Sequence, residues 1–327
     1  MFPQVRMRRL RRRIIRPLLT ETRIDKTDLI APLFFDETAG DPVPIASMPG
    51  VFRYPPAQAA EVCKNLAAQG IRAVLLFGIP AEKDEEASGA HASSGVIQQV
   101  IQAIKTAVPD MVVIPDLCAC EYTSHGHCGI IGDCQDGIDL KNDASLELMQ
   151  KIALSYARAG ADIVAPSCML DGMITAIRTA LDKEGFEEVL IMSYSSKFSS
   201  SLYGPFREAA GSGFSFGDRQ SYQAPVGNHR EAVRESEMDA AEGADILMVK
   251  PAGWFMDIIA EVKNLGLPVA AYQVSGEYSM IRAAAANGWL DERRIVMESL
   301  ICLKRAGADL IITYFAESVC RWLDEEQ

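Results

Sequence analysis

Short apolar runs alternate with longer amphipathic stretches along almost the whole sequence. The runs are rich in Val, Ile, Leu and Ala, as in strands that are covered on both faces. Eight runs have this character: Leu29–Phe35, Ile71–Gly78, Met111–Cys118, Asp162–Ser167, Val189–Ser195, Asp245–Pro251, Pro268–Ser275 and Asp309–Phe315. The intervening stretches carry apolar residues three and four positions apart, which predicts helices. Eight helices are predicted: Ala57–Gln69, Gly95–Val108, Ser145–Ala159, Met173–Lys183, Glu231–Glu242, Trp254–Leu265, Tyr278–Asn287 and Arg293–Arg305.

Eight strand–helix units in a chain of 327 residues predict an α/β fold, a single (β/α)8 TIM barrel over residues 29–327. A doubly wound open sheet is the alternative, but no G-x-G-x-x-G motif follows the first run. The tripeptide Gly-Ala-Asp begins at Gly160, Gly243 and Gly307, each time after a predicted helix and before a strand. In such a barrel, catalytic side chains lie at the C-terminal ends of the strands.

Residues 1–28 are predicted to form an extended N-terminal arm outside the barrel. Residues 1–16 contain seven arginines and no acidic residue, whereas the whole chain has a net charge of −12. We expect this basic arm to lie against an acidic body, its own or a neighbour's. Nucleic-acid binding is the alternative, but no aromatic platform or known nucleic-acid-binding module accompanies the arginines, so no nucleic acid partner is expected.

The distribution of apolar residues and cysteines bounds the cellular setting. No stretch approaches the roughly 18 apolar residues that cross a bilayer, and the N-terminus lacks the apolar core of a signal peptide. We therefore expect a cytoplasmic protein with no membrane partner. Eight cysteines in a chain of this length do not suggest a disulfide framework. Three of them cluster within eleven positions, which favours metal binding or catalysis in a reducing compartment.

The third apolar run leads into these cysteines. If the strand stays extended, Asp116, Cys118 and Cys120 share one face, and Cys128 returns from a glycine-containing loop. Three thiolates can hold one Zn²⁺ and leave a fourth position for water or substrate, as in catalytic zinc sites. Packing of free cysteines beside the strand is the alternative. The loop also contains two histidines that either support the metal ligands or only belong to the loop, His125 and His127.

Two lysines stand at the ends of neighbouring apolar runs. Lys197 follows the fifth run and Lys250 ends the sixth, and Ser193 and Ser195 are predicted to share a face with Lys197. Two nearby ammonium groups disfavour each other's charge, so both pKa values should be lowered. A neutral amine can attack a ketone and form a Schiff base. The alternative is that each lysine pairs with a carboxylate such as Asp116.

A long segment rich in Gly, Ser and aromatic residues lies between the fifth and sixth strands. Long loops in compact domains are usually lids or binding loops. Arg207 and Arg219 in this segment could bind a substrate carboxylate in a fork, or be surface arginines. Ser275 and Tyr314 end the seventh and eighth runs and could donate hydrogen bonds to a second carboxylate.

Seven motifs together resemble the 5-aminolevulinate dehydratase (porphobilinogen synthase) family, over nearly the whole chain and in the same order. They are D-L-C-A-C-E-Y-T-S-H-G-H-C-G, M-S-Y-S-S-K-F, Y-G-P-F-R-E-A-A-G-S, G-D-R-Q-S-Y-Q, L-M-V-K-P-A, Y-Q-V-S-G-E-Y and A-G-A-D-L-I-I-T-Y-F. The C-x-C-x7-C segment resembles the zinc-using branch, whereas other members replace these cysteines and use magnesium or monovalent ions. The resemblance implies a hydro-lyase of heme (tetrapyrrole) biosynthesis that condenses two 5-aminolevulinate molecules to porphobilinogen with loss of two waters.

The resemblance also implies a role for each candidate site residue. Schiff bases would form at Lys250 with the first substrate and at Lys197 with the second. Asp116 would handle protons or bind an amine. Zinc would be bound by Cys118, Cys120 and Cys128 and would polarise groups of the second substrate. The first carboxylate would meet Ser275 and Tyr314, and the second Arg207, Arg219 and Gln223. The remaining implied substrate contacts are Ser167, Tyr203, Phe206 and Tyr272.

Three further features concern assembly and additional metals. Family members are commonly homo-octamers whose N-terminal arms embrace neighbours, which fits the arginine-rich arm. Some bacterial members bind an allosteric Mg²⁺ near an acidic residue of helix six. Glu235 matches that position, although a glutamate on a charged helix is also typical of a solvated face. Ser221 replaces a cysteine that holds a second zinc in some members, so that zinc is not expected.

Two other functions fit part of the pattern. A Schiff-base aldolase on the same barrel would explain one lysine but not the second lysine or the three cysteines. A zinc-stabilised structural or binding protein predicts a closed site with four ligands, and only three good ligands are apparent in the sequence.

Overall fold

Eight parallel strands form a closed barrel in the computed structural model, which describes residues 2, 4–134, 137–213, 215 and 217–325. Each strand pairs with the next, and the last pairs with the first to close the ring. The strands are β1 (Leu29–Asp36), β4 (Ala73–Ile79), β5 (Val112–Leu117), β8 (Ile163–Pro166), β9 (Leu190–Lys197), β10 (Ile246–Lys250), β11 (Val269–Gln273) and β12 (Leu310–Thr313). The predicted (β/α)8 barrel is therefore confirmed.

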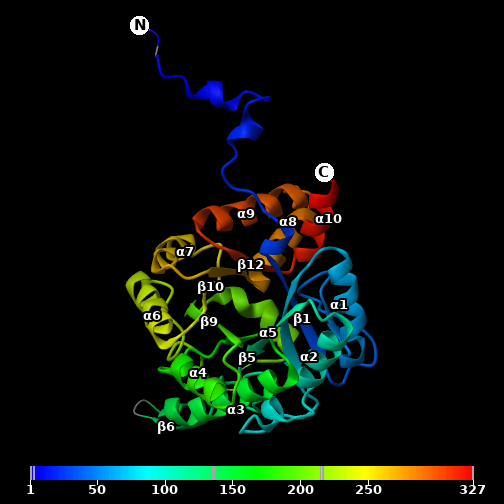
Figure 1. Cartoon of the computed structure of the whole chain (residues 1–327), viewed down its shortest axis with the longest axis vertical. Helices are drawn as coiled ribbons and strands as arrows, with labels where there is room; N and C mark the ends of the chain where they lie inside the picture. Colours follow the sequence, from blue (N-terminus) through cyan, green and yellow to red (C-terminus); the bar gives the residue numbers. More distant parts are fainter. Residues whose placement is uncertain (1, 3, 135–136, 214, 216, 326–327) are drawn as a thin grey trace.

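Helices connect the strands and surround the barrel (Figure 1). They are α1 (Ala59–Ala68), α2 (Val96–Ala107), α3 (Asn142–Ala159), α4 (Met173–Lys183), α5 (Gly204–Ala210), α6 (His229–Glu242), α7 (Met256–Val262), α8 (Ser275–Ala286), α9 (Glu292–Ala306) and α10 (Ala316–Glu325). Each of the eight predicted helices coincides with one of these. Helix α10, which completes the eighth unit and buries Val319 and Cys320, lies outside the predicted ranges.

The three Gly-Ala-Asp tripeptides fix where strands begin. Gly160 and Gly243 end α3 and α6 with φ of 104° and 105°, which an L side chain rarely adopts. The aspartate of each tripeptide makes two hydrogen bonds with one residue of the neighbouring strand. The aspartate carboxylate accepts from the N–H of that residue, and the aspartate N–H donates to the carbonyl of the same residue. The pairs are Asp162–Val113 (2.8 and 3.1 Å), Asp245–Ile191 (2.7 and 2.9 Å) and Asp309–Val269 (2.8 and 2.8 Å). We call these residues the strand-start aspartates.

The connections after the strand ends carry extra elements. Strands β2 (Val43–Pro44) and β3 (Phe52–Tyr54) follow β1, and the β6–β7 hairpin (Ile131–Cys134 and Gly137–Leu140) follows the cysteine loop. The long segment between β9 and α6 contains the short helices η6 (Ser201–Tyr203) and α5. None of these elements was expected from periodicity, because each is too short to show one.

Strand β9 contains a bulge just before its end. Leu247 of β10 pairs with Ser193, but Val249 pairs with Ser196, so β9 holds one extra residue there. The Ser193 hydroxyl consequently donates to Asp239 of α6, outside the barrel, whereas Lys197 points into the site. The predicted common face for Ser193, Ser195 and Lys197 is therefore wrong, because the bulge reverses the alternation between them.

The N-terminal arm extends away from the barrel (Figure 1). Its turns η1 (Met7–Arg11) and η2 (Arg16–Leu19) bury none of their residues, whereas η3 (Lys26–Asp28) leads directly into β1. Its large apolar side chains are exposed: Phe2, Val5, Met7, Leu10, Ile14, Leu18 and Leu19. In the described part of the chain, no helix has the length and apolarity needed to cross a membrane.

Candidate active site

Lys250 and Lys197 lie side by side at the ends of β10 and β9, where they pair in register. Each is 5% exposed. The Nζ of Lys197 donates a 2.6 Å hydrogen bond to the carbonyl of Ser167. The Nζ of Lys250 lies among four aromatic rings, at these distances from their centroids: Tyr272 4.3 Å, Tyr194 4.8 Å, Phe206 5.1 Å and Tyr203 5.4 Å. The faces of aromatic rings attract a nearby ammonium group by cation–π interaction but do not accept its proton.

The two lysines differ in protonation. Burial, and then the charge of Lys197, lowers the pKa of Lys250 to about 7. Burial alone would also lower the pKa of Lys197, but the sulfurs of Cys128 and Cys118 outweigh it and raise that pKa. The predicted lowering therefore holds for Lys250 and is wrong for Lys197, because Lys197 faces the cysteines.

Tyr194 is a site residue that sequence reasoning missed. Its ring lies 4.8 Å from the Nζ of Lys250 and 5.5 Å from that of Lys197. Strict alternation along β9 would place Ser193 and Ser195 inside and Tyr194 outside, and the bulge produces the opposite arrangement. The signal available in the sequence was the aromatic residue itself, within a strand end otherwise made of serines.

Two buried carboxyl groups accompany the lysines. Asp116 is 8% exposed, accepts a 3.0 Å hydrogen bond from the Ser167 hydroxyl, and has its pKa raised by burial. Glu121 is 3% exposed, and burial, followed by Asp116, raises its pKa to about 7. Within the described residues, Oδ1 of Asp116 and Oε1 of Glu121 have no hydrogen-bond partner. Glu121 was not predicted, although it directly follows Cys120.

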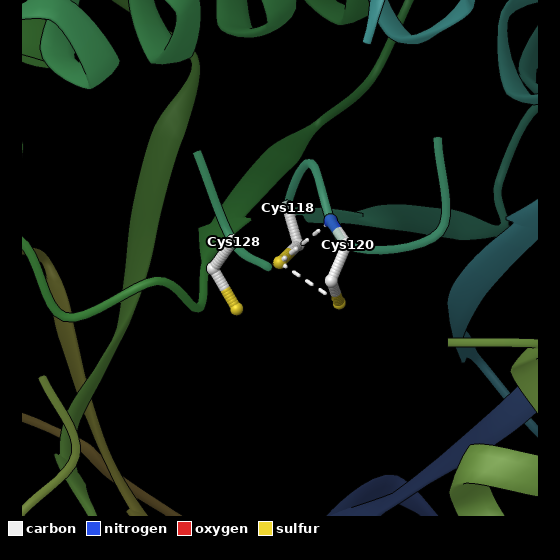
Figure 2. Close-up of side chains that lie close together, drawn as sticks. All are labelled: Cys118, Cys120 and Cys128. Atoms are coloured by element: carbon white, nitrogen blue, oxygen red, sulfur yellow. Dashed lines mark hydrogen bonds between the residues drawn. The ribbon is translucent and has the colours of Figure 1, made fainter. Parts of the chain in front are cut away.

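The three clustered cysteines converge as Figure 2 shows. Strand β5 ends at Leu117, so the extended chain expected there does not continue, yet the following turn still brings the thiols together. The Sγ atoms of Cys118 and Cys120 are 3.2 Å apart, and those of all three lie within 4.8 Å of one another. Hydrogen bonds from Cys118 and Cys120 lower the pKa of Cys128 well below its usual range. Three buried sulfurs with a stabilised thiolate fit a thiophilic ion such as Zn²⁺.

The two histidines of the cysteine loop lie outside this group of sulfurs. The N–H of His127 donates to Nδ1 of His125 at 3.2 Å, and Nδ1 of His127 lies 3.1 Å from the Tyr222 hydroxyl. Arg219 donates to the Gly126 carbonyl at 2.9 Å. The cysteine loop and the long segment after β9 are therefore held together.

The predicted second carboxylate holders lie in that long segment. Arg219 and Gln223 are buried, and Nε of Arg219 and Nε2 of Gln223 have no acceptor among the described residues. Buried donors are normally satisfied, so this pair lacks an acceptor that a carboxylate could provide. Burial, and then the charge of Arg219, lowers the pKa of Arg207, which indicates that the two guanidinium groups are near each other. An anion between them would relieve this repulsion.

The predicted first carboxylate holders are arranged differently from expectation. The hydroxyls of Tyr314 and Tyr272 lie 3.1 Å apart. Ser275 begins α8 rather than ending a strand, so its predicted position is wrong. The chain turns into a helix after Gln273. The Ser275 hydroxyl accepts a hydrogen bond from the Phe206 N–H at 3.0 Å and donates one to the Leu202 carbonyl at 3.2 Å.

Tyr203 and Phe206, from the long segment after β9, cover the site beside Lys250. The Tyr203 hydroxyl donates to the Lys250 carbonyl at 3.1 Å, and the Phe206 ring lies edge-on to Phe77 with centroids 5.0 Å apart. Together with the buried lysines and Asp116, these contacts show a site that is shut from solvent by the segment after β9.

Glu235 lies on α6, away from the lysines. Burial, and then Asp171, raises its pKa. Both residues line a cavity of about 290 Å³, together with Glu231 and Ser221. This wall is acidic, and a hard divalent cation prefers such oxygen donors.

The comparisons with known proteins agree with one another. A family model described as delta-aminolevulinic acid dehydratase matches residues 4–322. The chain is similar to delta-aminolevulinic acid dehydratases of Synechococcus elongatus (51% identity, 99% of this chain and 100% of that protein) and Archaeoglobus fulgidus (52%, 98% and 99%). It also resembles the crystal structure of the Toxoplasma gondii enzyme with its product porphobilinogen, with a TM-score of 0.96 and 40% identity over 99% of this chain and 93% of that one.

Proposed function

This chain belongs to the delta-aminolevulinic acid dehydratase family, and we propose that it acts through Schiff bases at Lys250 and Lys197 beside a three-cysteine zinc site. The reaction it catalyses is the condensation of two 5-aminolevulinate molecules to porphobilinogen, a lyase step of porphyrin biosynthesis. The observation that carries the proposed mechanism is the pair of lysines in register on adjacent strands, buried together at the end of the barrel.

Lys250 is the first nucleophile in this proposal. Its pKa of about 7 leaves a large neutral fraction, and the neutral amine adds to the substrate ketone and releases water. The iminium that forms is positive, and the surrounding faces of Tyr272 and Tyr194 stabilise that charge. Asp116, with a raised pKa and an oxygen that has no hydrogen-bond partner among the described residues, is placed to take and return protons.

Lys197 is the second Schiff-base residue and stands next to the cysteines. Its pKa is raised, so it needs a base or the bound metal charge before it can attack. Zinc held by Cys118, Cys120 and Cys128 would supply a positive charge and a Lewis acid for the second substrate. The zinc charge would also offset most of the thiolate charge that raises the pKa of Lys197.

The two carboxylate sites differ in charge and in the elements that carry them, which supports an order of binding. Tyr314 stands directly after β12, on the rigid barrel, and Ser275 begins α8. Arg207, Arg219 and Gln223 belong to the long segment after β9. We propose that the neutral pocket receives the first substrate and that the arginines close over the second. The unsatisfied donors of Arg219 and Gln223 support this assignment.

Assembly and regulation follow the family pattern in our proposal. The exposed apolar side chains and seven arginines of residues 1–16 need a partner surface, and we propose a neighbouring subunit of a homo-octamer. Mg²⁺ at Glu235 is the proposed allosteric ion. All eight cysteines are free thiols, which supports a reducing compartment such as the cytoplasm.

Incubation with 5-aminolevulinate tests the mechanism. We expect a pyrrole that gives colour with an aldehyde reagent, and borohydride should trap substrate on Lys250 and, in part of the population, on Lys197. Lys250→Ala should abolish both colour and turnover, whereas the exposed-lysine control Lys151→Ala should retain them. A Schiff-base aldolase would give one adduct and no pyrrole, and near-normal turnover by Lys250→Ala would refute the assignment.

A further inference from the structure

A fourth buried cysteine adjoins the three that converge. Cys168 follows β8, and its Sγ lies 3.5 Å from the Sγ of Cys118. It also contacts the Met149 sulfur at 3.5 Å and the Leu117 carbonyl at 3.8 Å, both of them weak partners for a thiol. It is completely buried. Cys168 is not part of the compact group of three sulfurs, so its side chain would have to move to join them.

We propose that Cys168 is a fourth sulfur ligand that closes the metal site in the absence of substrate and leaves it when substrate binds. This inference rests on the proposed zinc site. Zn–S bonds of about 2.3 Å in a tetrahedron place neighbouring sulfurs about 3.8 Å apart. The distances from Cys118 to Cys168 and to Cys120, 3.5 and 3.2 Å, are both close to this length. No strong hydrogen bond has to be broken for the Cys168 sulfur to move.

The charges around the cluster favour a fourth thiolate. Zn²⁺ with four thiolates carries two negative charges, and a buried charge must be compensated. Two buried cations interact with these sulfurs, Lys197 and Arg219. Lys197 is hydrogen-bonded to the carbonyl of Ser167, the residue before Cys168. Compensation for a dianionic centre is therefore already in place.

The ligand exchange conserves protons and charge. On binding, the Cys168 thiol loses its proton to solvent and its sulfur donates an electron pair to the metal. When an oxygen or nitrogen of the substrate takes the fourth position, the thiolate leaves and recovers a proton. In the absence of substrate, Cys168 would thus occupy the coordination position that the substrate takes during catalysis. A cysteine that only fills space would leave the metal's ligand set unchanged when replaced.

X-ray absorption at the zinc edge counts the sulfur ligands directly, without relying on activity. The zinc-loaded full-length protein is measured with and without 5-aminolevulinate, and Cys168→Ser and Cys168→Ala are measured without it. Cys120→Ser is the positive control, and Cys320→Ser, in the remote helix α10, is the matched buried control. Circular dichroism establishes whether each variant is folded. If Cys168→Ser does not fold, Cys168→Ala takes its place in the comparison.

The expected result is four sulfurs in the resting native protein and in Cys320→Ser. Both Cys168 variants, and the native protein with substrate, should show three sulfurs and one lighter ligand. Three sulfurs in the resting native protein, unchanged in the Cys168 variants, would overturn the inference while leaving the proposed zinc site intact. No sulfur loss in Cys120→Ser, or no bound zinc at all, would overturn both.

Discussion

Lys250 should form its Schiff base at a pH where an ordinary lysine is almost fully protonated. Burial, and then the charge of Lys197, lowers its pKa from 10.5 to about 7. At pH ~7 about half of the amine is then neutral, compared with roughly one part in 3000 for an unperturbed lysine. The structure therefore provides on the order of a thousandfold more nucleophile, which corresponds to about 5 kcal/mol between the two protonation states.

Replacing Lys197 separates the two causes of this lowering. Lys197→Met removes the neighbouring charge but keeps the burial, so the pKa of Lys250 should rise and still stay below 10.5. Lys197→Arg retains the charge and is the matched control, which should keep the low pKa. The Lys250 adduct should therefore need a higher pH in Lys197→Met than in Lys197→Arg.

The rate of adduct formation at Lys250 can be followed against pH by borohydride quenching and mass spectrometry of the peptide that contains it. The native protein and Lys197→Arg should show an inflection near pH 7, which matches the lowered Lys250 pKa of about 7. An inflection close to 10.5 in the native protein would refute the reasoning, because it would mean that burial does not favour the neutral amine.

Five further substitutions test other parts of the structure. Cys128→Ser should lower the bound zinc measured by elemental analysis while circular dichroism stays unchanged; full zinc content would contradict the site. Arg207→Ala and Arg219→Ala should raise the substrate concentration needed for turnover by roughly tenfold to a hundredfold. The Lys250 adduct should survive in both, and its loss in either would show that the two carboxylate pockets are wrongly assigned. Asp309→Asn should lower the free energy of unfolding by about 1–3 kcal/mol in denaturant titrations, because it weakens the hydrogen bond to Val269 and removes the ion pair with Lys263. Turnover should change little, because both contacts lie at the end of the barrel opposite the site; reduced turnover at full stability would contradict this. Lys250→Met should raise the free energy of unfolding by up to about 4 kcal/mol near pH ~7. Between about pH 7 and pH 10.5 the Lys250 amine is protonated in the unfolded chain and neutral in the folded one, so the stability of the native protein rises with pH in that window. The stability gained by Lys250→Met should therefore disappear above about pH 10.5. A gain that does not depend on pH would exclude this cause.

The barrel was predictable because its signals are local and repeated. Each apolar run and each stretch of helical periodicity is continuous in the sequence, the two alternate eight times, and the described strands and helices follow them. Helix α10 lay outside the predicted ranges, although Val319 and Cys320 pack against the barrel. The bulge in β9 depends on how β10 pairs with it, so strand alternation alone assigned Ser193 to the wrong side.

The site was predictable where residue type and strand position coincide. Lys250, Lys197, Asp116 and the three cysteines lie together because parallel strands end at one rim of the barrel. The raised pKa of Lys197 could not be predicted, because it depends on the distance to thiols that are distant in sequence. The sequence places Cys168 near the expected site, directly after the fourth apolar run, but it assigns no role to this cysteine, because its distance to Cys118 depends on how two strand–helix units pack.

The strand-start aspartates have a consequence for how the barrel assembles. Each joins two strands that are consecutive in the barrel: β5 with β8, β9 with β10, and β11 with β12. These three pairs are separate βαβ quarters of the ring, and each carries its own alignment in a side-chain hydrogen bond. In these three quarters the alignment is fixed at the end of the barrel opposite the paired lysines of the site. Sequence changes in the loops around those lysines therefore leave these hydrogen bonds in place.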